Sequence, residues 1–289
     1  MGDTAELGPL RVERSAGRVV VTLDRPGARN AVDRATVDAL HAVCAELEAE
    51  PRTLVLAGAN GDFAAGADIA ELLGRGADDA RAGINTRCFD RIAALPMPVI
   101  AAVDGYALGG GAELAYAADL RIGTPRMRIG SLEPTLGIMP AAGATWRLPA
   151  VVGATRAAEL LLTARVLTGD EALAWGLVTA LHDPADLLPA AHELADRIAR
   201  LAPAAVRHTK TALRARPDQH PGLELDLQAE LFESEEKRSR MRAFLDRKGH
   251  PAASAKGAAQ GADRGTSPAP GAEPEGTTRS ERPQTEENR

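Results

Sequence analysis

The chain has 289 residues, of which 45% are hydrophobic and 26% charged, so it holds enough apolar material for a sizeable core and is neither fibrous nor wholly disordered. Lys and Arg total 34 against 40 Asp and Glu, a formal charge of -6, which gives no overall attraction to nucleic acid. Cys44 and Cys88 are too few for a disulfide framework or a Cys-based zinc site. No apolar stretch approaches the roughly 20 residues that cross a bilayer, and no signal pattern opens the chain, so we expect a cytoplasmic protein that does not enter a membrane.

The chain begins with a predicted hairpin and a predicted helix. Residues 10–14 and 18–23 flank the turn Ser15-Ala16-Gly17, which predicts two paired strands. Asp33 is a predicted helix N-cap, because apolar residues then recur at helical spacing until Pro51.

Two short apolar stretches, residues 53–57 and 98–103, are predicted to be buried strands, and each is followed by a Gly-rich run. A helix is predicted between them, over residues 79–94. Strands that alternate with helices indicate an α/β layered fold, in which the loops at strand ends carry the chemistry. The two Gly-rich runs are therefore the first place to look for function.

The chain after Gly153 is predicted to be mostly helical, over residues 154–163, 170–175, 183–201 and 223–245. Asp170 is the predicted N-cap of the second of these helices, and Gly176 its predicted end. From Gly249 onward there is no Leu, Ile, Val, Met or aromatic residue, which predicts a disordered tail. The predicted organisation is a core over residues 1–195, a C-terminal helical oligomerisation or lid region over 196–248, and the tail 249–289.

Three short motifs resemble known chemical sites but lack residues that those sites need. Gly61–Gly66 has phosphate-loop spacing, but Ala67 and Asp68 follow where Lys and Ser or Thr are needed. His192 opens a segment like a zinc-protease helix but has no second His four residues later. Ser131 lacks the flanking pattern of a nucleophile elbow. We expect neither a metal site nor a serine nucleophile.

Two loops, Phe63–Asp68 and Leu108–Glu113, combine small residues with the start of a predicted helix. Small residues let the backbone approach a ligand closely, and a helix N-terminus presents unpaired N–H groups at the positive end of its dipole. Two such groups that grip one oxygen form an oxyanion hole, in which one donor contributes about 3 kcal/mol of transition-state stabilisation. Either loop alone is equally consistent with a tight turn. Together, with an acidic residue at a fixed offset, they favour a catalytic site.

These residues also carry a family resemblance. The segments FAAGADIAEL, PVIAAVDGYALGGGAELAYAADLRIGT and LTGDEALAWGLV resemble the crotonase superfamily, most closely its enoyl-CoA hydratases, over about residues 10–248. The resemblance implies an α/β fold with a ββα spiral core and a C-terminal helical region, assembled as a homotrimer or a dimer of trimers. It implies reversible addition of water to a trans-2-enoyl-CoA, giving a 3-hydroxyacyl-CoA. No cofactor is implied, because coenzyme A is part of the substrate.

The resemblance further implies roles for individual residues. The backbone N–H groups of Ala67 and Gly110 would hold the thioester oxygen, while Glu113 mainly activates water and Glu133 mainly protonates Cα. Strongly coupled carboxyls share their protons, so these two roles overlap. The implied substrate-binding and CoA-binding residues are Arg29, Ala31, Ala65, Gly66, Asp68, Ile69, Tyr106, Gly109, Pro140, Ala141 and Lys248.

Several positions depart from the hydratase pattern. The differing residues are Leu132, Pro134, Ala141, Ala144, Trp146 and the pair Ser239-Arg240. Ala141 and Ala144 replace glycines, and the methyl group of Ala141 is expected to narrow the pocket or displace the reacting water. Double-bond isomerisation, which needs only one carboxyl base, is the nearest alternative reaction. Another crotonase-type acyl-CoA reaction, or a subunit that binds acyl-CoA or a partner without turnover, also remains open.

Overall fold

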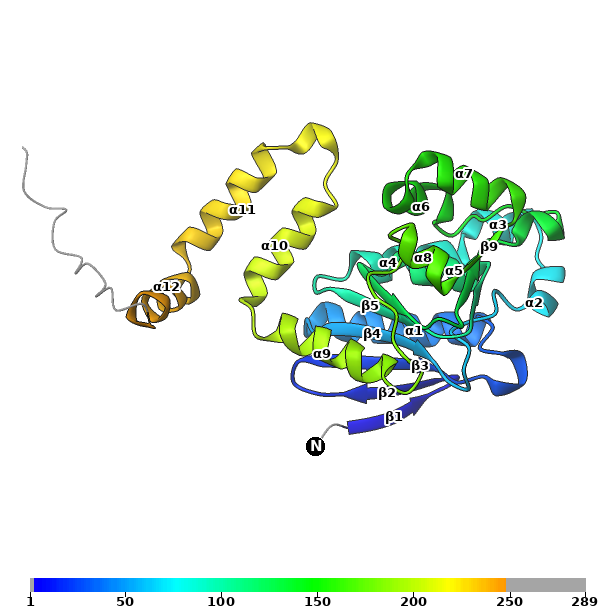
Figure 1. The fold of residues 1–289 in the computed structure, drawn as a ribbon, viewed down its shortest axis with the longest axis horizontal. Coiled ribbons are helices and arrows are strands. Elements are labelled where there is room, and N and C mark those ends of the chain that lie inside the picture. Colours follow the sequence, from blue (N-terminus) through cyan, green and yellow to red (C-terminus); the bar gives the residue numbers. More distant parts are fainter. Residues whose placement is uncertain (1–2, 248–289) are drawn as a thin grey trace, which may run out of the picture. The chain divides into compact units, whose positions relative to one another are not determined.

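The structure, a computed structural model, describes residues 3–247 (Figure 1). The chain divides after Arg240 into two compact units, and the first, residues 1–240, contains both sheets and the cavity analysed below. The predicted tail, residues 249–289, lies outside the described residues, and the predicted boundaries at residues 195 and 248 stay predictions. Within residues 3–247, no helix is long and apolar enough to span a membrane.

A six-stranded sheet is the largest element of the first unit, with strand order β1-β2-β3-β4-β5-β7. Strands β1 to β3 pair antiparallel, and β3, β4, β5 and β7 pair in parallel. The predicted hairpin is confirmed with the predicted bounds. The strands are β1 (Asp3–Leu7), β2 (Leu10–Arg14), β3 (Arg18–Leu23), β4 (Thr53–Gly58), β5 (Val99–Val103) and β7 (Leu120–Gly123).

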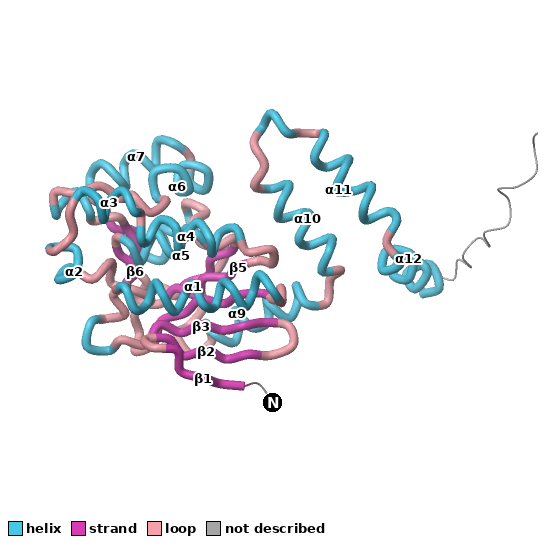
Figure 2. Tube along the Cα trace, turned by 180° about the vertical axis from the view of Figure 1, so that it is seen from behind, coloured by secondary structure: helices cyan, strands magenta, loops and turns pink. Residues whose placement is uncertain are grey.

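Side chains of the parallel strands alternate between two cores, because successive residues of a strand point to opposite faces. Val55 and Ile100 pack with α9 (Leu187–Ala199) in the smaller core. Their neighbours along the strands belong to the larger core, with α1 (Arg34–Ala49) and α4 (Ile84–Ala94). Figures 1 and 2 show α9 on one side of the sheet and α1 on the other.

A three-stranded sheet with the order β6-β8-β9 lies beside α5, and its strand β6 leads into that helix. The second half of the chain is mostly helical, as predicted. These elements are β6 (Tyr106–Leu108), β8 (Arg128–Gly130), β9 (Val166–Thr168), α2 (Ile69–Leu73), α3 (Ala77–Ala82), α5 (Gly110–Ala117), α6 (Ala144–Val152), α7 (Ala154–Thr163), α8 (Gly169–Ala174), α10 (Pro203–Leu213), α11 (Gly222–Glu233), α12 (Glu235–Arg247) and the 3₁₀ helices η1 (Pro26–Ala28), η2 (Glu133–Leu136) and η3 (Pro217–Gln219).

Two predictions of a long continuous helix are wrong, because each of these helices is interrupted in the structure. The helix predicted over residues 79–94 is interrupted at Gly83, whose φ of +62° ends α3 before α4 begins. The helix predicted over 223–245 is interrupted at Ser234, which has an extended backbone and accepts a hydrogen bond from the backbone N–H of Lys237. A third prediction, a helix from residue 183, is wrong at its start, because α9 begins only at Leu187.

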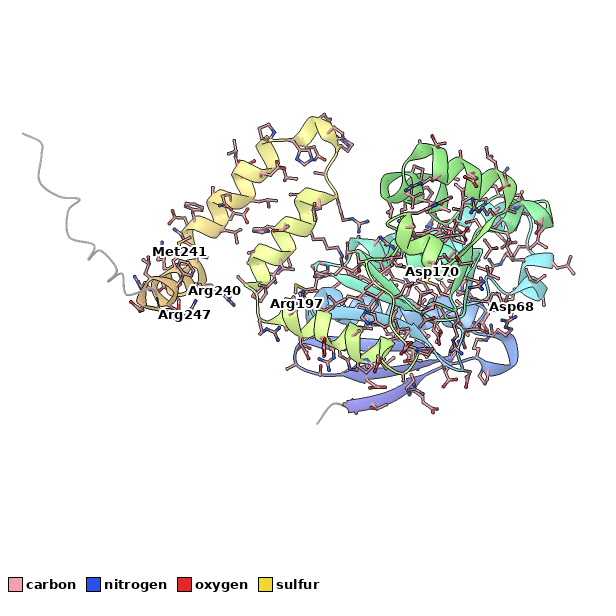
Figure 3. All side chains as sticks on the ribbon, in the orientation of Figure 1. Asp68, Asp170, Arg197, Arg240, Met241 and Arg247 are labelled. Carbon is pink, nitrogen blue, oxygen red and sulfur yellow. The ribbon has the colours of Figure 1, made fainter. Side chains whose placement is uncertain are left out.

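The N-cap of α8 is Thr168, and the prediction that Asp170 caps this helix is wrong. The Thr168 hydroxyl accepts a hydrogen bond from the backbone N–H of Glu171, and the Glu171 carboxylate accepts one from the backbone N–H of Thr168. This reciprocal pair is a capping box. Asp170, labelled in Figure 3, lies in the first turn of the helix. Gly176, with φ of +76°, follows the last turn as predicted.

We predict that Thr168→Ala destabilises the protein by about 1 kcal/mol, because the substitution removes the side-chain acceptor of the capping box. Asp170→Ala is the matched control in the first turn of the same helix, and we expect it to change stability by no more than a few tenths of a kcal/mol. Urea unfolding of both variants measures the difference. Equal losses in the two variants, or a larger loss for Asp170→Ala, would contradict the assignment of the cap.

Candidate active site

A cavity of about 900 Å³ opens where α2, α4, α5 and η2 meet. It is lined by both predicted loops and by both predicted glutamates. Ile84, Asn85 and Thr86, at the start of α4, contribute part of its wall. The predicted site residues that line it are Ala65, Gly66, Ala67, Ile69, Gly109, Gly110, Glu113, Glu133 and Ala141.

The two loops approach each other so closely that side chains are excluded between them. Ala64 pairs with Ala107 of β6 in a parallel bridge, and its carbonyl accepts a hydrogen bond from the backbone N–H of Leu108 at 3.1 Å. A Cβ atom added at Gly111 would lie only 2.1 Å from the carbonyl oxygen of Ala64. The glycine at position 111 is therefore required by the contact between α5 and residue 64.

This contact brings two unpaired backbone donors together. A Cβ atom on Gly110 would lie 3.3 Å from the backbone nitrogen of Ala67. Gly110 is the first residue of α5, so its N–H has no partner within the helix. Within residues 3–247, no acceptor binds the N–H of Ala67 or of Gly110. Both residues line the cavity, so the two donors are available to an oxygen atom of a ligand.

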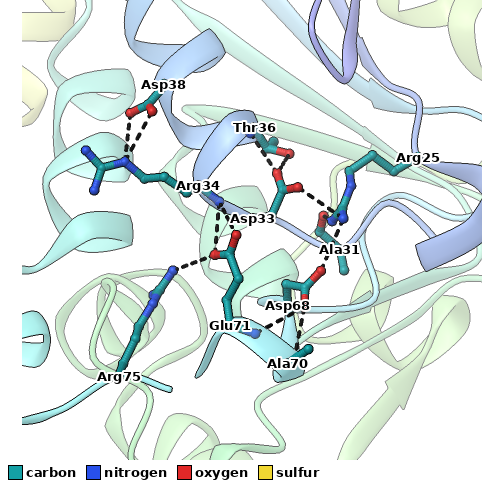
Figure 4. Close-up of polar contacts among 10 residues, drawn as sticks. All are labelled: Arg25, Ala31, Asp33, Arg34, Thr36, Asp38, Asp68, Ala70, Glu71 and Arg75. Atoms are coloured by element: carbon teal, nitrogen blue, oxygen red, sulfur yellow. Dashed lines mark hydrogen bonds and ion pairs between the residues drawn. The ribbon is translucent and has the colours of Figure 1, made fainter. Parts of the chain in front are cut away.

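Asp68 holds the end of the first loop, and Figure 4 shows its contacts. Its carboxylate caps α2 by accepting hydrogen bonds from the backbone N–H groups of Ala70 and Glu71, as its predicted position near a helix start requires. Arg25 forms ion pairs with Asp68 at 3.1 Å and with Asp33 at 3.0 Å. Because Asp33 is the N-cap of α1, one guanidinium joins the starts of two helices and fixes the loop that carries Ala67.

Glu113 lies in the first turn of α5 and is 3% exposed. Its Oε1 atom accepts hydrogen bonds from the backbone N–H groups of Ala142 at 2.7 Å and Ala144 at 3.1 Å. Burial raises the pKa of Glu113 to about 7, and the nearby Glu133 carboxylate adds to this rise, while the two backbone donors oppose it. Glu113 is thus divided between its protonated and ionised forms near neutral pH.

Glu133 begins η2 and is 8% exposed. No other residue within the described range donates to either of its carboxylate oxygens. Burial raises the pKa of Glu133 as well. A Cβ atom on Gly109 would lie 3.2 Å from Oε1 of Glu133, so the carboxylate lies beside the start of α5, next to Gly110.

The loop that holds Glu113 is itself held by Arg147, which was not predicted. Its Nη1 atom donates to the carbonyl of Ala142 at 3.0 Å, its Nη2 atom pairs with Asp90, and its charge opposes the rise in the pKa of Glu113. The methyl group of Ala144 leaves the donation from its own N–H to Glu113 intact. Ala141 lines the cavity, and the effect of its methyl group on the reacting water stays a prediction.

A family model described as enoyl-CoA hydratase/isomerase matches residues 13–252. The chain belongs to this family. It is 37% identical over 252 residues to the short-chain-enoyl-CoA hydratase of Clostridium acetobutylicum, which covers 84% of this chain and 97% of that relative. It is 36% identical over 246 residues to the crotonyl-CoA hydratase of Syntrophomonas wolfei, covering 82% and 95%.

Solved structures agree with this assignment. A crystal structure of enoyl-CoA hydratase from Bacillus anthracis matches with a TM-score of 0.79 at 31% identity, covering 84% of this chain and 98% of that one. The predicted membership of the crotonase superfamily, closest to enoyl-CoA hydratases, and the predicted α/β crotonase fold with C-terminal helices are confirmed.

Some of the residues that the family resemblance implied do not line the cavity. Arg29 stacks on the Tyr106 ring at 4.3 Å and donates to Asp62 at 2.9 Å. The carbonyl of Ala31 accepts a hydrogen bond from Arg25, and Pro140 is buried. Lys248 lies outside the described residues. Roles of these residues in binding CoA stay predictions.

Sequence reasoning missed Asn85 and the backbone of Ala142. Asn85 lies in the segment predicted only as a helix over residues 79–94, and an Asn carries no motif by itself. The donation from Ala142 to Glu113 comes from the backbone, which is invisible in residue types. The MPAAGATW segment was the available signal, since it differs from the family pattern at Ala144, whose N–H contacts Glu113, and at Ala141 beside Ala142.

We predict that the free energy of unfolding of the wild type falls relative to that of Glu113→Gln as pH rises from 4.5 to 8. A carboxyl with a pKa near 7 when folded and 4.5 when unfolded binds more protons in the folded state within this window, so the folded state loses stability with rising pH. The relative change should be about 2–3 kcal/mol. Urea unfolding of both proteins at pH 5 and pH 8 measures it, and a difference that does not change with pH would contradict the raised pKa.

Proposed function

We propose that this chain catalyses the reversible addition of water to a trans-2-enoyl-CoA, giving a 3-hydroxyacyl-CoA. Relatives named as enoyl-CoA hydratases match nearly their whole length at 36–37% identity, which supports this activity. The observation that carries the proposal is one cavity in which the unpaired N–H groups of Ala67 and Gly110 adjoin two buried glutamates with raised pKa values.

The paired N–H groups are suited to the thioester oxygen of the substrate. When water adds to Cβ of a conjugated thioester, electrons move onto that oxygen and give an enolate. Donors from Ala67 and Gly110 stabilise the negative charge where it develops, and they need no reorganisation because both loops are fixed by the contacts of Ala64, Gly111 and Asp68.

The two carboxyl groups move the protons. Glu113 has its Oε1 atom held by two backbone donors, which leaves Oε2 to accept a proton from water as the water oxygen bonds to Cβ. Protonated Glu133 then gives its proton to Cα, and the enolate electrons form the new C–H bond. One water molecule is added in all, and the pair regains its starting protonation by exchange with solvent. Coupling between the carboxyls allows them to share these roles.

We propose that the reaction uses these groups alone and that coenzyme A enters only as part of the substrate. The predicted contacts of Arg29, Tyr106 and Lys248 with CoA belong to this proposal. We further propose a cytoplasmic homotrimer or dimer of trimers. Large apolar side chains that remain exposed on the late helices, such as Leu213 and Leu225 at 82% and 67% exposure, support self-association.

We predict that wild type removes the conjugated thioester absorbance of crotonyl-CoA and that Glu113→Gln and Glu133→Gln each lower kcat by at least about 100-fold, because each variant removes one proton-transfer group. The measurement is the loss of absorbance with time, with the same assay repeated on a longer 2-enoyl-CoA.

Glu159→Gln, on the exposed face of α7, is the control for loss of a carboxylate elsewhere and should retain the wild-type rate. A 3-enoyl-CoA tests the isomerase alternative in the same assay, because isomerisation would increase the absorbance. Wild type that isomerises the 3-enoyl substrate and does not hydrate either 2-enoyl substrate would overturn the proposal.

A further inference from the structure

Besides Glu133, Asn85 is the one polar cavity-lining residue whose side chain has no partner among the described residues. Within residues 3–247, its Oδ1 atom is buried without a hydrogen bond, and its Nδ2 atom donates to no protein acceptor. The other polar side chains of the lining are engaged within the protein: Arg75 with Glu71, Asp79 with the Gly76 N–H, Thr86 with the Ala141 carbonyl and Thr135 with the Leu132 carbonyl.

The unpaired side-chain amide of Asn85 does not stabilise the folded protein. Asn85 is the second residue of α4, whose N-cap, Gly83, has no side-chain cap, and the Asn85 side chain does not take over this role. Leaving a buried amide atom without a partner costs stability. An apolar residue would complete the cavity wall without that cost. The part of the amide that a ligand oxygen can pair with is Nδ2, which donates to no acceptor among the described residues.

The location of Asn85 indicates which part of the ligand it binds. A Cβ atom on Gly110 would lie 3.6 Å from Nδ2 of Asn85 and 3.3 Å from the backbone nitrogen of Ala67. One point in space is therefore bordered by the Ala67 N–H, by the first residue of α5 and by the Asn85 amide. Both nitrogens thus border the Cβ position of Gly110, and an oxygen atom bound beside it by the backbone donors would meet the NH₂ group of Asn85.

We propose that the side-chain amide of Asn85 is a third hydrogen-bond donor to the thioester oxygen, and hence a further catalytic residue of the hydration. This inference rests on the proposed function, and it assigns a side chain to an anion site otherwise made of backbone. The donor acts mainly in the transition state, because the charge on the oxygen is largest there.

The kinetic test compares Asn85→Ala, which removes both N–H donors, with Asn85→Asp, which keeps the shape, removes the donors and adds a carboxylate that repels the developing charge. Removing one donor from an oxyanion hole typically lowers kcat by 100-fold to 1000-fold, and for a neutral third donor we expect about 10-fold to 100-fold, with KM changed by less than about threefold. Arg87→Ala, an exposed residue two positions along the same helix and outside the cavity lining, is the control and should behave as wild type.

A binding measurement separates this inference from the hydratase proposal. The absorption band of a push-pull chromophore such as 4-(dimethylamino)cinnamoyl-CoA moves to longer wavelength as donors polarise its thioester carbonyl, whether or not turnover follows. We expect the bound band of Asn85→Asp and Asn85→Ala to lie at shorter wavelength than that of wild type. If wild type hydrates no substrate but this difference is present, the result supports Asn85 as a third donor and contradicts the proposed hydration.

Two results would overturn the role of Asn85. One is a kcat within twofold of wild type in both variants, with the chromophore band unchanged. The other is a rise in KM at unchanged kcat, because that would assign Asn85 to binding that is equal in the ground state and the transition state. Unfolding curves of Asn85→Asp and Asn85→Ala that match the wild type exclude loss of structure as the cause of a lower kcat.

Discussion

The close approach of α5 to the loop over residues 63–68 is the constraint on which the site depends. Ala64 pairs with the strand that leads into α5, and Gly111 lets the helix contact the Ala64 carbonyl. This packing brings the N–H group of Ala67 close to Gly110 at the edge of a cavity, and among residues 3–247 neither of the two N–H groups has an acceptor. The cost of two unpaired donors is offset by the surrounding contacts, chiefly the cap that Asp68 provides for α2 and the ion pairs of Arg25.

The same helix sets the electrostatics of the site. Glu113 is placed by the first turn of α5, and the loop pinned by Arg147 directs two backbone donors onto one of its oxygens. Glu133 approaches from η2 without donors of its own, so burial raises its pKa. Burial raises the pKa of both carboxyls, that of Glu113 to about 7, so the coupled pair can hold one proton and supply both the acid and the base that addition of water across a double bond requires.

Local sequence signals predicted those parts of the molecule that local physics determines. The hairpin over residues 10–23, the Asp33 cap and α7 have the predicted bounds, since turn residues and apolar spacing specify them. The second sheet was missed because its strands span only three residues each, and α6 was missed because Pro149 lies inside it. In the site, the residues of the two Gly-rich loops and the two glutamates were predictable. The position of Asn85 and the contacts of Arg147 arise from tertiary packing, which the sequence pattern does not show.

The proposed catalysis depends on the Gly110 N–H, which would stabilise charge on the substrate oxygen. The most direct measurement replaces Gly110 with glycolic acid, which substitutes an ester oxygen for that N–H and adds no side chain to the crowded start of α5. We predict a fall in kcat for crotonyl-CoA hydration of at least about 100-fold, with KM and the unfolding curve little changed. A kcat within threefold of wild type would contradict the account, because the donor would then have no part in stabilising the transition state.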